Sequence, residues 1–111
     1  MQTLLINPLD PSQQVQVFGL IDTGADITVM PTAIIAQLGI VHSGDILVSG
    51  FDGTTQICPT YLVDLQIGRH QFDLVEVVPT FTNELILGRD VINQIDIRLN
   101  GPQLVLEILN Y

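Results

Sequence analysis

The chain has 111 residues and a mass of 12.2 kDa, which is the size of one ordinary domain, so we expect a single domain over residues 1–111. Leu, Ile and Val supply 40 of the 111 residues, and this apolar content excludes an intrinsically disordered chain. The mean hydropathy is +0.45. No uncharged apolar run, however, reaches the ~18 residues that a membrane-spanning helix needs.

The charge limits the partners of the chain. Twelve acidic residues stand against three arginines and no lysine, for a formal net charge of −9. Such a surface repels phosphate groups, so we expect neither nucleic acid nor a membrane as a partner. The first residues lack the basic segment of a secretory signal, and the single Cys58 has no partner for an internal disulfide. Both features favour a cytoplasmic location.

Turn residues divide the chain into short segments, most of which have the apolar or alternating pattern of β-strands. Pro31 and Gly39 bound a predicted two-turn helix, and a second short helix is predicted at 89–94. Asn100-Gly101 is the signal of a two-residue hairpin turn. In chain order, the predicted strands are residues 3–6, 15–21, 45–48, 55–57, 61–67, 72–78, 85–87, 95–99 and 104–109. The pattern predicts an all-β fold with two short helices, in which the sheet is either closed or sandwiched.

The segment Asp22-Thr23-Gly24 contains the residues that are best suited to catalysis. Asp22 follows an apolar strand, where a carboxylate is costly unless it accepts hydrogen bonds. Thr23 offers a hydroxyl group, and Gly24 offers a backbone amide that can approach closely. A second unit of apolar strand, glycine and helix follows at 85–92, but no carboxylate precedes its glycine. The two units look like copies of one motif, of which only the first is equipped for acid–base chemistry.

Three segments resemble the retropepsin-like aspartic proteases, the group that includes the retroviral proteases. They are Asp22-Thr23-Gly24-Ala25-Asp26, residues 48–53 and residues 85–90, and the resemblance spans about residues 15–98. It implies a small closed acid-protease barrel that acts as a homodimer, with one Asp-Thr-Gly loop from each subunit. It also implies a peptide or protein substrate and no cofactor or metal.

The resemblance assigns roles to individual residues. It implies that Asp22 is the catalytic aspartate, that the Thr23 hydroxyl links the two loops across the dimer, and that Gly24 contacts the substrate backbone. Arg89 is implied to support Asp26 from behind, and we expect that ion pair to be partly buried. The substrate-binding residues that the resemblance implies are Ala25, Asp26, Val29, Val48, Ser49, Gly50, Phe51 and Ile86.

Physical chemistry supports the homodimer independently. Two closely spaced carboxylates cannot both ionise, so they share a proton, and one can activate water while the other protonates the carbonyl group. The chain has one Asp-Thr-Gly segment, so a second copy must come from another subunit through a two-fold axis. A hairpin that closes over the site excludes water during the reaction.

Two functions remain open from the sequence. The leading hypothesis is a homodimeric aspartic endopeptidase that activates water between two Asp22 carboxylates. The alternative is a non-catalytic dimerisation or peptide-binding module that retains the acid-protease fold, because fold does not imply function. The chain is also compatible with a protease domain cut from a longer retroelement polyprotein. Among the remaining residues, Asp90 is expected to cap a helix, Cys58 to pack as a small hydrophobic residue, and His42 and His70 to bind no zinc.

Overall fold

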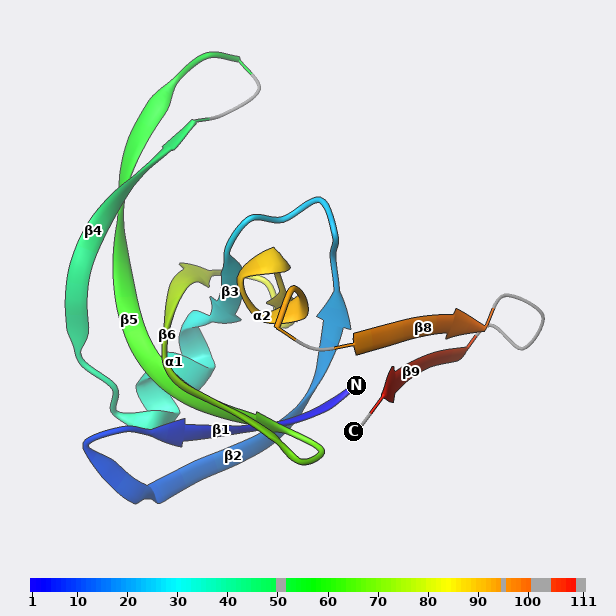
Figure 1. Cartoon of the computed structure of the whole chain (residues 1–111). Coiled ribbons are helices and arrows are strands. Elements are labelled where there is room, and N and C mark those ends of the chain that lie inside the picture. Colours follow the sequence, from blue (N-terminus) through cyan, green and yellow to red (C-terminus); the bar gives the residue numbers. More distant parts are fainter. Residues whose placement is uncertain (50–51, 95, 101–104, 110–111) are drawn as a thin grey trace.

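The computed structural model describes residues 1–49, 52–94, 96–100 and 105–109. Within these ranges the chain forms two short helices and nine strands (Figure 1). The elements are β1 (Gln2–Asn7), β2 (Asp10–Ile21), β3 (Thr28–Pro31), α1 (Thr32–Leu38), β4 (His42–Ser49), β5 (Thr55–Ile67), β6 (His70–Thr80), β7 (Leu85–Leu87), α2 (Arg89–Ile92), β8 (Asp96–Asn100) and β9 (Val105–Leu109). Neither of these helices is long and apolar enough to cross a membrane.

Six strands close into a barrel. The sheet has the order β1-β2-β7-β3-β6-β5-β4, and β1 also pairs with β5. That extra pairing joins the two ends of the series β1-β2-β7-β3-β6-β5, while β4 lies outside it and pairs with β5. The predicted all-β fold with a closed sheet and two short helices is therefore confirmed, and the sandwich is excluded.

Alternate residues of the strands fill the barrel with aliphatic side chains, as expected for strands with one buried face. Helix α1 packs against β2, β3 and β6 and adds Ile35 and Leu38 to the core. Burial of these side chains supplies most of the free energy that favours folding. The core residues that are at most 1% exposed are Leu5, Met30, Leu38, Val63, Leu65, Ile67, Val77, Leu85, Leu87 and Val91.

The bounds of α1 differ slightly from the prediction. Pro31 is the last residue of β3 and the N-cap of α1, so the helix itself begins at Thr32. Gly39 closes the helix as predicted: its φ of 67° is left-handed, and its amide donates to Ile35 O and Ala36 O. Strand β3 was not predicted, because its four residues have no alternation of their own.

Two predicted strands, residues 55–57 and 61–67, are one strand. Pro59 lies within β5, where we had expected an interruption. Pro59 pairs with Asp45 of β4, and the pairing of β5 with β6 begins only at Tyr61. A proline, which has no amide hydrogen, is tolerated where only one side of a strand is paired. The result is a long β4–β5 hairpin that extends beyond the barrel (Figure 1).

Strands β8 and β9 form a separate two-stranded sheet that stands away from the barrel (Figure 1). The predicted hairpin of the last two strands is confirmed, because Asp96–Asn100 pairs antiparallel with Val105–Leu109. Gly101 of the predicted turn and residue 104, the predicted start of the last strand, lie outside the described residues. The predicted helix 89–94 ends earlier, at Ile92. Residue 95, the predicted start of the next strand, lies outside the described residues.

Candidate active site

The Asp22 loop is held by β7, which runs between the two strands that flank the loop. Ile21 of β2 pairs with Leu87 in parallel, and Val29 of β3 pairs with Ile86 in antiparallel. The Asp22 amide then donates to Leu87 O at 3.1 Å. The backbone of Asp22 is therefore fixed by the same strand that separates β2 from β3.

The carboxylate of Asp22 is oriented by its own loop. Its Oδ1 accepts a hydrogen bond from the Gly24 amide at 2.8 Å, and the Ala25 amide donates to Asp22 O at 3.2 Å. A Cβ atom at residue 24 would lie 3.2 Å from that same Oδ1, so glycine lets the amide approach the carboxylate closely. Asp22, Thr23 and Gly24 are all exposed in the single chain. The acid lies at the end of the apolar strand, as expected, but it is not buried.

Beneath the loop lies a buried hydrogen-bond network that the sequence did not indicate. The Thr28 hydroxyl donates to Asp90 Oδ1 at 2.9 Å and accepts a hydrogen bond from the Gly88 amide at 3.2 Å. The Thr28 amide donates to Asp90 Oδ2 at 3.2 Å. Asp90 also accepts the Val91 amide at 3.0 Å. It lies in the first turn of α2, where an acid complements the helix dipole, but the N-cap residue is Gly88, whereas the sequence had predicted Asp90. The other hydrogen bonds of the Asp90 carboxylate, from Thr28, join α2 to β3.

Gly88 allows α2 to pack directly against the Asp22 loop. A Cβ atom at residue 88 would lie 2.7 Å from both the carbonyl carbon and the oxygen of Ile27. That distance is shorter than any ordinary contact, so only glycine fits there. The next amide, Arg89 N, donates to Ala25 O at 2.8 Å. The loop is thus tied to the start of α2 through the backbone.

The side chain of Arg89 pairs with the Asp26 carboxylate. The two side chains are 49% and 83% exposed, respectively. The pair therefore lies at the surface of the single chain, and the prediction of a partly buried pair is wrong for the single chain.

The predicted substrate-binding residues fall into two groups. Ala25 and Asp26 lie in the loop, and the half-buried Val29 and Ile86 are paired neighbours behind it. The second group, Val48 and Ser49, is exposed at the end of β4. The predicted tip residues Gly50 and Phe51 lie outside the described residues. The hairpin and the Asp22 loop project on the same side of the barrel (Figure 1).

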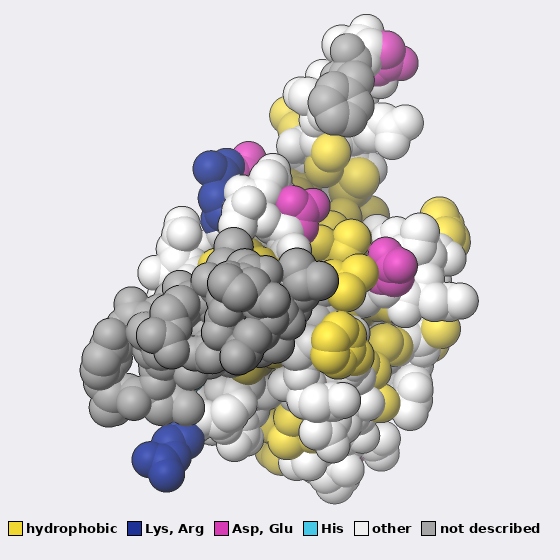
Figure 2. Space-filling model, turned by 90° about the vertical axis from the view of Figure 1, so that its right-hand side faces the viewer, with side chains coloured by type: hydrophobic (Ala, Val, Ile, Leu, Met, Phe, Trp, Pro, Cys, Tyr) yellow, Lys and Arg dark blue, Asp and Glu magenta, His cyan; other side chains and the backbone are white. Residues whose placement is uncertain are grey.

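The hairpin carries two perturbed ionisable groups and an apolar surface. Asp52 accepts hydrogen bonds from the side chain and amide of Thr54, which lower the pKa of Asp52. At the base of the hairpin, the hydrogen bond from His42 to Asp45 raises the pKa of His42. Leu47, Val48 and Ile57 are exposed along the hairpin. Figure 2 shows hydrophobic side chains both there and on the barrel beneath it.

The described residues contain no cluster of three or more His, Cys, Asp or Glu side chains that would suit a metal ion. His70 stacks on Phe72, and Cys58 is a half-buried free thiol. The polar groups of the Asp22 loop are the carboxylates of Asp22 and Asp26, the Thr23 hydroxyl and backbone amides. Such a set suits acid–base chemistry on a bound water molecule.

A family model described as "gag-polyprotein putative aspartyl protease" matches residues 12–94. The protease of EIAV in complex with the inhibitor HBY-793 is similar in structure, with a TM-score of 0.58 and 21% sequence identity over 85% of this chain and 84% of that chain. A foamy viral protease–reverse transcriptase has a TM-score of 0.56 and 18% identity; the match covers 97% of this chain but 12% of that longer one. No curated protein sequence matches this chain.

Proposed function

This chain belongs to the family of gag-polyprotein aspartyl proteases and has the retropepsin-like fold, and from that premise we propose that it is a homodimeric aspartic endopeptidase. Its substrates are peptides or proteins bound in an extended conformation, and it uses neither a metal nor another cofactor. The observation that carries the proposal is the geometry of Asp22, whose carboxylate is oriented by the Gly24 amide and is exposed at the end of β2.

The proposed reaction needs two Asp22 carboxylates, one from each subunit, that share a single proton. The ionised carboxylate takes a proton from a water molecule as the water oxygen attacks the carbonyl carbon of the peptide. The protonated carboxyl group of the other Asp22 gives its proton to the carbonyl oxygen. In the tetrahedral intermediate, the Asp22 carboxyl group that took the proton from water gives it to the amide nitrogen, and the C–N bond breaks. A hydroxyl proton of the intermediate returns to the other Asp22, so that the products are a carboxylic acid, an amine and a pair of carboxylates that again share one proton.

The other site residues receive supporting roles in this proposal. The Thr23 hydroxyl links the two loops, and the Gly24 backbone lies against the substrate. Arg89 holds the Asp26 carboxylate, which accepts a hydrogen bond from the substrate backbone. The proposed walls of the cleft are Ala25, Val29 and Ile86 below and Val48, Ser49, Gly50 and Phe51 of the hairpin above. An extended substrate would lie between them as an added strand.

The exposure of Asp22, Thr23 and Gly24 in the single chain supports a second subunit at this place. The reaction uses one bound water molecule and is favoured when bulk water is excluded, which a fully exposed carboxylate does not achieve. A two-fold axis beside Asp22 would both bring the second carboxylate and cover the first.

The proposal includes a cytoplasmic location and a single domain over residues 1–111.

The test is Asp22→Asn. We expect peptide cleavage to fall by more than ~10²-fold, because the general acid and base are both lost. Circular dichroism and sedimentation should show an unchanged fold and dimer. The matched control is Glu84→Gln, which removes a carboxylate from an exposed loop position and should retain full activity. Wild-type cleavage should also follow a bell-shaped pH profile with its optimum below neutrality, since the shared proton is lost as the pH rises.

Turnover of Asp22→Asn within about tenfold of the wild type would refute the catalytic assignment. A wild-type protein that dimerises and binds extended peptides but cleaves none of them at any pH would instead favour the non-catalytic module.

A further inference from the structure

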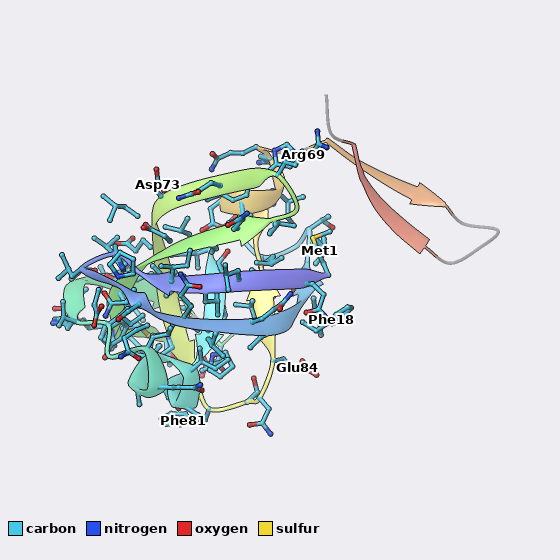
Figure 3. The ribbon with its side chains drawn as sticks, turned by 90° about the horizontal axis from the view of Figure 1, so that it is seen from below. Met1, Phe18, Arg69, Asp73, Phe81 and Glu84 are labelled. Atoms are coloured by element: carbon cyan, nitrogen blue, oxygen red, sulfur yellow. The ribbon has the colours of Figure 1, made fainter. Side chains whose placement is uncertain are left out.

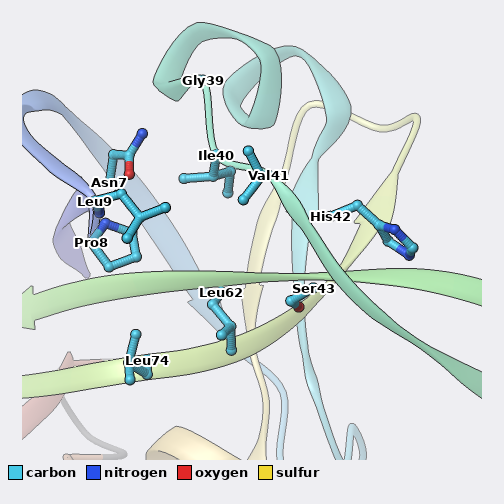
Figure 4. Close-up of a pocket in the computed structure, with 10 residues that line it drawn as sticks. All are labelled: Asn7, Pro8, Leu9, Gly39, Ile40, Val41, His42, Ser43, Leu62 and Leu74. Atoms are coloured by element: carbon cyan, nitrogen blue, oxygen red, sulfur yellow. Dashed lines mark hydrogen bonds between the residues drawn. The ribbon is translucent and has the colours of Figure 1, made fainter.

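An apolar pocket opens on the surface of the barrel (Figure 4). It has a volume of about 210 Å³ and is lined by the aliphatic side chains of Leu9, Val41, Leu62 and Leu74 among others. Pockets for cofactors and drug-sized ligands have volumes of ~300–1,000 Å³, so this one is of the right size for a single large side chain. Leu9, Val41 and Leu74 are 80%, 61% and 59% exposed. The single chain thus leaves much apolar surface uncovered at this place.

The backbone of Leu74, which lines the pocket, has an energetically unfavourable conformation. Its φ of 54° makes it the one left-handed residue other than glycine in the described chain, and such a backbone is unfavourable for leucine. The Asp64 carboxylate accepts the Leu74 amide at 2.8 Å, beside an irregularity in the β5–β6 pairing between Val63 and Leu65. The rest of the fold therefore keeps a large apolar side chain exposed in a strained conformation.

Leu74 also lines a second cavity, of about 330 Å³, whose other walls are mainly acidic. This cavity includes Asp26, Asp73, Glu76 and Asp90. Because Leu74 is common to both cavities, the apolar pocket and the acidic cavity are adjacent. Together we call them the outer groove.

The acidic cavity is short of positive charge. Asp26 is paired with Arg89. Within the described residues, the other three carboxylates accept hydrogen bonds only from neutral donors. These bonds run from Gln71 to Asp73, from Thr60 to Glu76, and from Thr28 and the Val91 amide to Asp90. A cationic ligand would therefore complement this part of the groove.

The outer groove begins at the candidate active site. Asp26 and Ile27 line the acidic cavity, and both belong to the loop that starts at Asp22. A polypeptide that leaves the active site past Asp26 would therefore enter the acidic cavity first and reach the apolar pocket across Leu74. In a two-fold dimer, each subunit would present one such groove, so segments on both sides of the cleaved bond would have one available.

We propose that the outer groove binds the part of a polypeptide substrate that extends beyond the active site. The substrate segment would place a Lys or Arg side chain beside Asp73 and Glu76 and a large aliphatic or aromatic side chain in the pocket at Leu74. This inference rests on the proposed protease function and specifies its substrate class: polypeptides with a basic and apolar segment that flanks the cleaved bond.

The experiment compares three peptides that contain one cleavable core sequence. The first is the core alone, the second adds a flanking segment with two arginines and a leucine, and the third replaces those arginines with glutamates. We expect the basic extension to lower KM on the order of tenfold with kcat unchanged, because it adds binding that is equal in the ground state and the transition state. The acidic extension should give no gain, and 0.5 M NaCl should reduce the gain of the basic one.

Two variants distinguish substrate binding in the outer groove from catalysis at Asp22. Leu74→Gly removes the side chain from the pocket and suits the left-handed backbone, and the double variant Asp73→Asn with Glu76→Gln removes two charges. Both should abolish the KM advantage of the basic extension while leaving the kinetics on the core peptide unchanged. Glu84→Gln is the charge control and should retain the advantage, because Glu84 and Asp73 lie at well-separated positions on the barrel (Figure 3).

A binding measurement tests the outer groove independently of catalysis. The fluorescently labelled basic extension, without the core, should bind to the Asp22→Asn protein in a salt-dependent manner, and Leu74→Gly in the same background should weaken that binding. Equal KM values for the basic and acidic extensions, or no binding of the isolated extension, would overturn this inference. If the extension binds but no core peptide is cleaved, the protease function fails and the groove stands as a binding site for basic, apolar segments.

Discussion

The buried hydroxyl of Thr28 donates a hydrogen bond to Oδ1 of Asp90, a residue 62 positions further along the chain, at 2.9 Å. The same hydroxyl accepts the buried Gly88 amide. One side chain thereby fixes the start of α2 relative to β3, directly behind the Asp22 loop. The position of the candidate catalytic carboxylate therefore depends on a polar contact between two distant segments.

Thr28→Val should lower the free energy of unfolding by ~1–3 kcal/mol, because valine has the shape of threonine but leaves the buried Gly88 amide without its acceptor. Urea denaturation measures the change. Thr28→Ser, which keeps the hydroxyl group, is the matched control and should lose much less. Equal stability of the valine variant and the wild type would show that the network contributes nothing.

Gly88→Ala should destabilise the protein by about 1–3 kcal/mol or more, because the added Cβ would have to displace the backbone of Ile27. Thermal unfolding followed by circular dichroism checks this. Gly44→Ala is the control, since a Cβ atom there would lie 3.4 Å from the Thr60 hydroxyl, an ordinary contact. If both variants unfold at the wild-type temperature, α2 does not pack against the loop as the structure has it.

Arg89→Ala should change the unfolding free energy of the single chain by only ~0–1 kcal/mol, because both members of the Arg89–Asp26 pair are largely exposed. The measurement is urea denaturation at a concentration at which sedimentation shows monomers. Arg89→Lys serves as the control that keeps the charge. A loss of several kcal/mol would mean that the pair is buried after all.

The specific activity should fall on dilution, because each proposed site needs two chains. An excess of Asp22→Asn chains should also inhibit the wild-type enzyme, since mixed dimers hold one ionisable carboxylate instead of two. Peptide-cleavage assays across a dilution series and a mixing series check both effects. The same excess of Glu84→Gln chains should raise activity instead. Full specific activity in a monomeric sample would exclude the two-chain site.

His42 should titrate above its ordinary pKa, because the hydrogen bond to Asp45 favours the charged imidazole. Since the folded-state pKa is raised, the contribution of this pair to stability is fully present below about pH 6.5. It is lost as the pH rises through the raised value. NMR titration of the imidazole protons measures the shift, and Asp45→Asn should bring the pKa of His42 down. An unchanged titration of His42 in that variant would exclude Asp45 as the cause.

Local sequence was sufficient for the features that depend on neighbours along the chain. Pro31 and Gly39 bound α1 because proline fits a helix start and glycine adopts the left-handed conformation at its end. The apolar run of residues 85–87 predicted a short strand, which the structure confirms, and Asp22-Thr23-Gly24 carried the resemblance that the family comparison confirms.

The sequence by itself thus determined the strand-rich class, the presence of two short helices and the family of this protein, because these follow from residue type and short spacing. Only the tertiary structure decided that β5 runs through Pro59, that Asp90 binds Thr28 instead of serving its own helix alone, and that Leu74 joins an apolar pocket to an acidic one. Each of these depends on segments that are distant in sequence but paired in the barrel. The local conformational preferences of the residues do not indicate such contacts, because the contacts contribute free energy only when the barrel closes and brings the partners together.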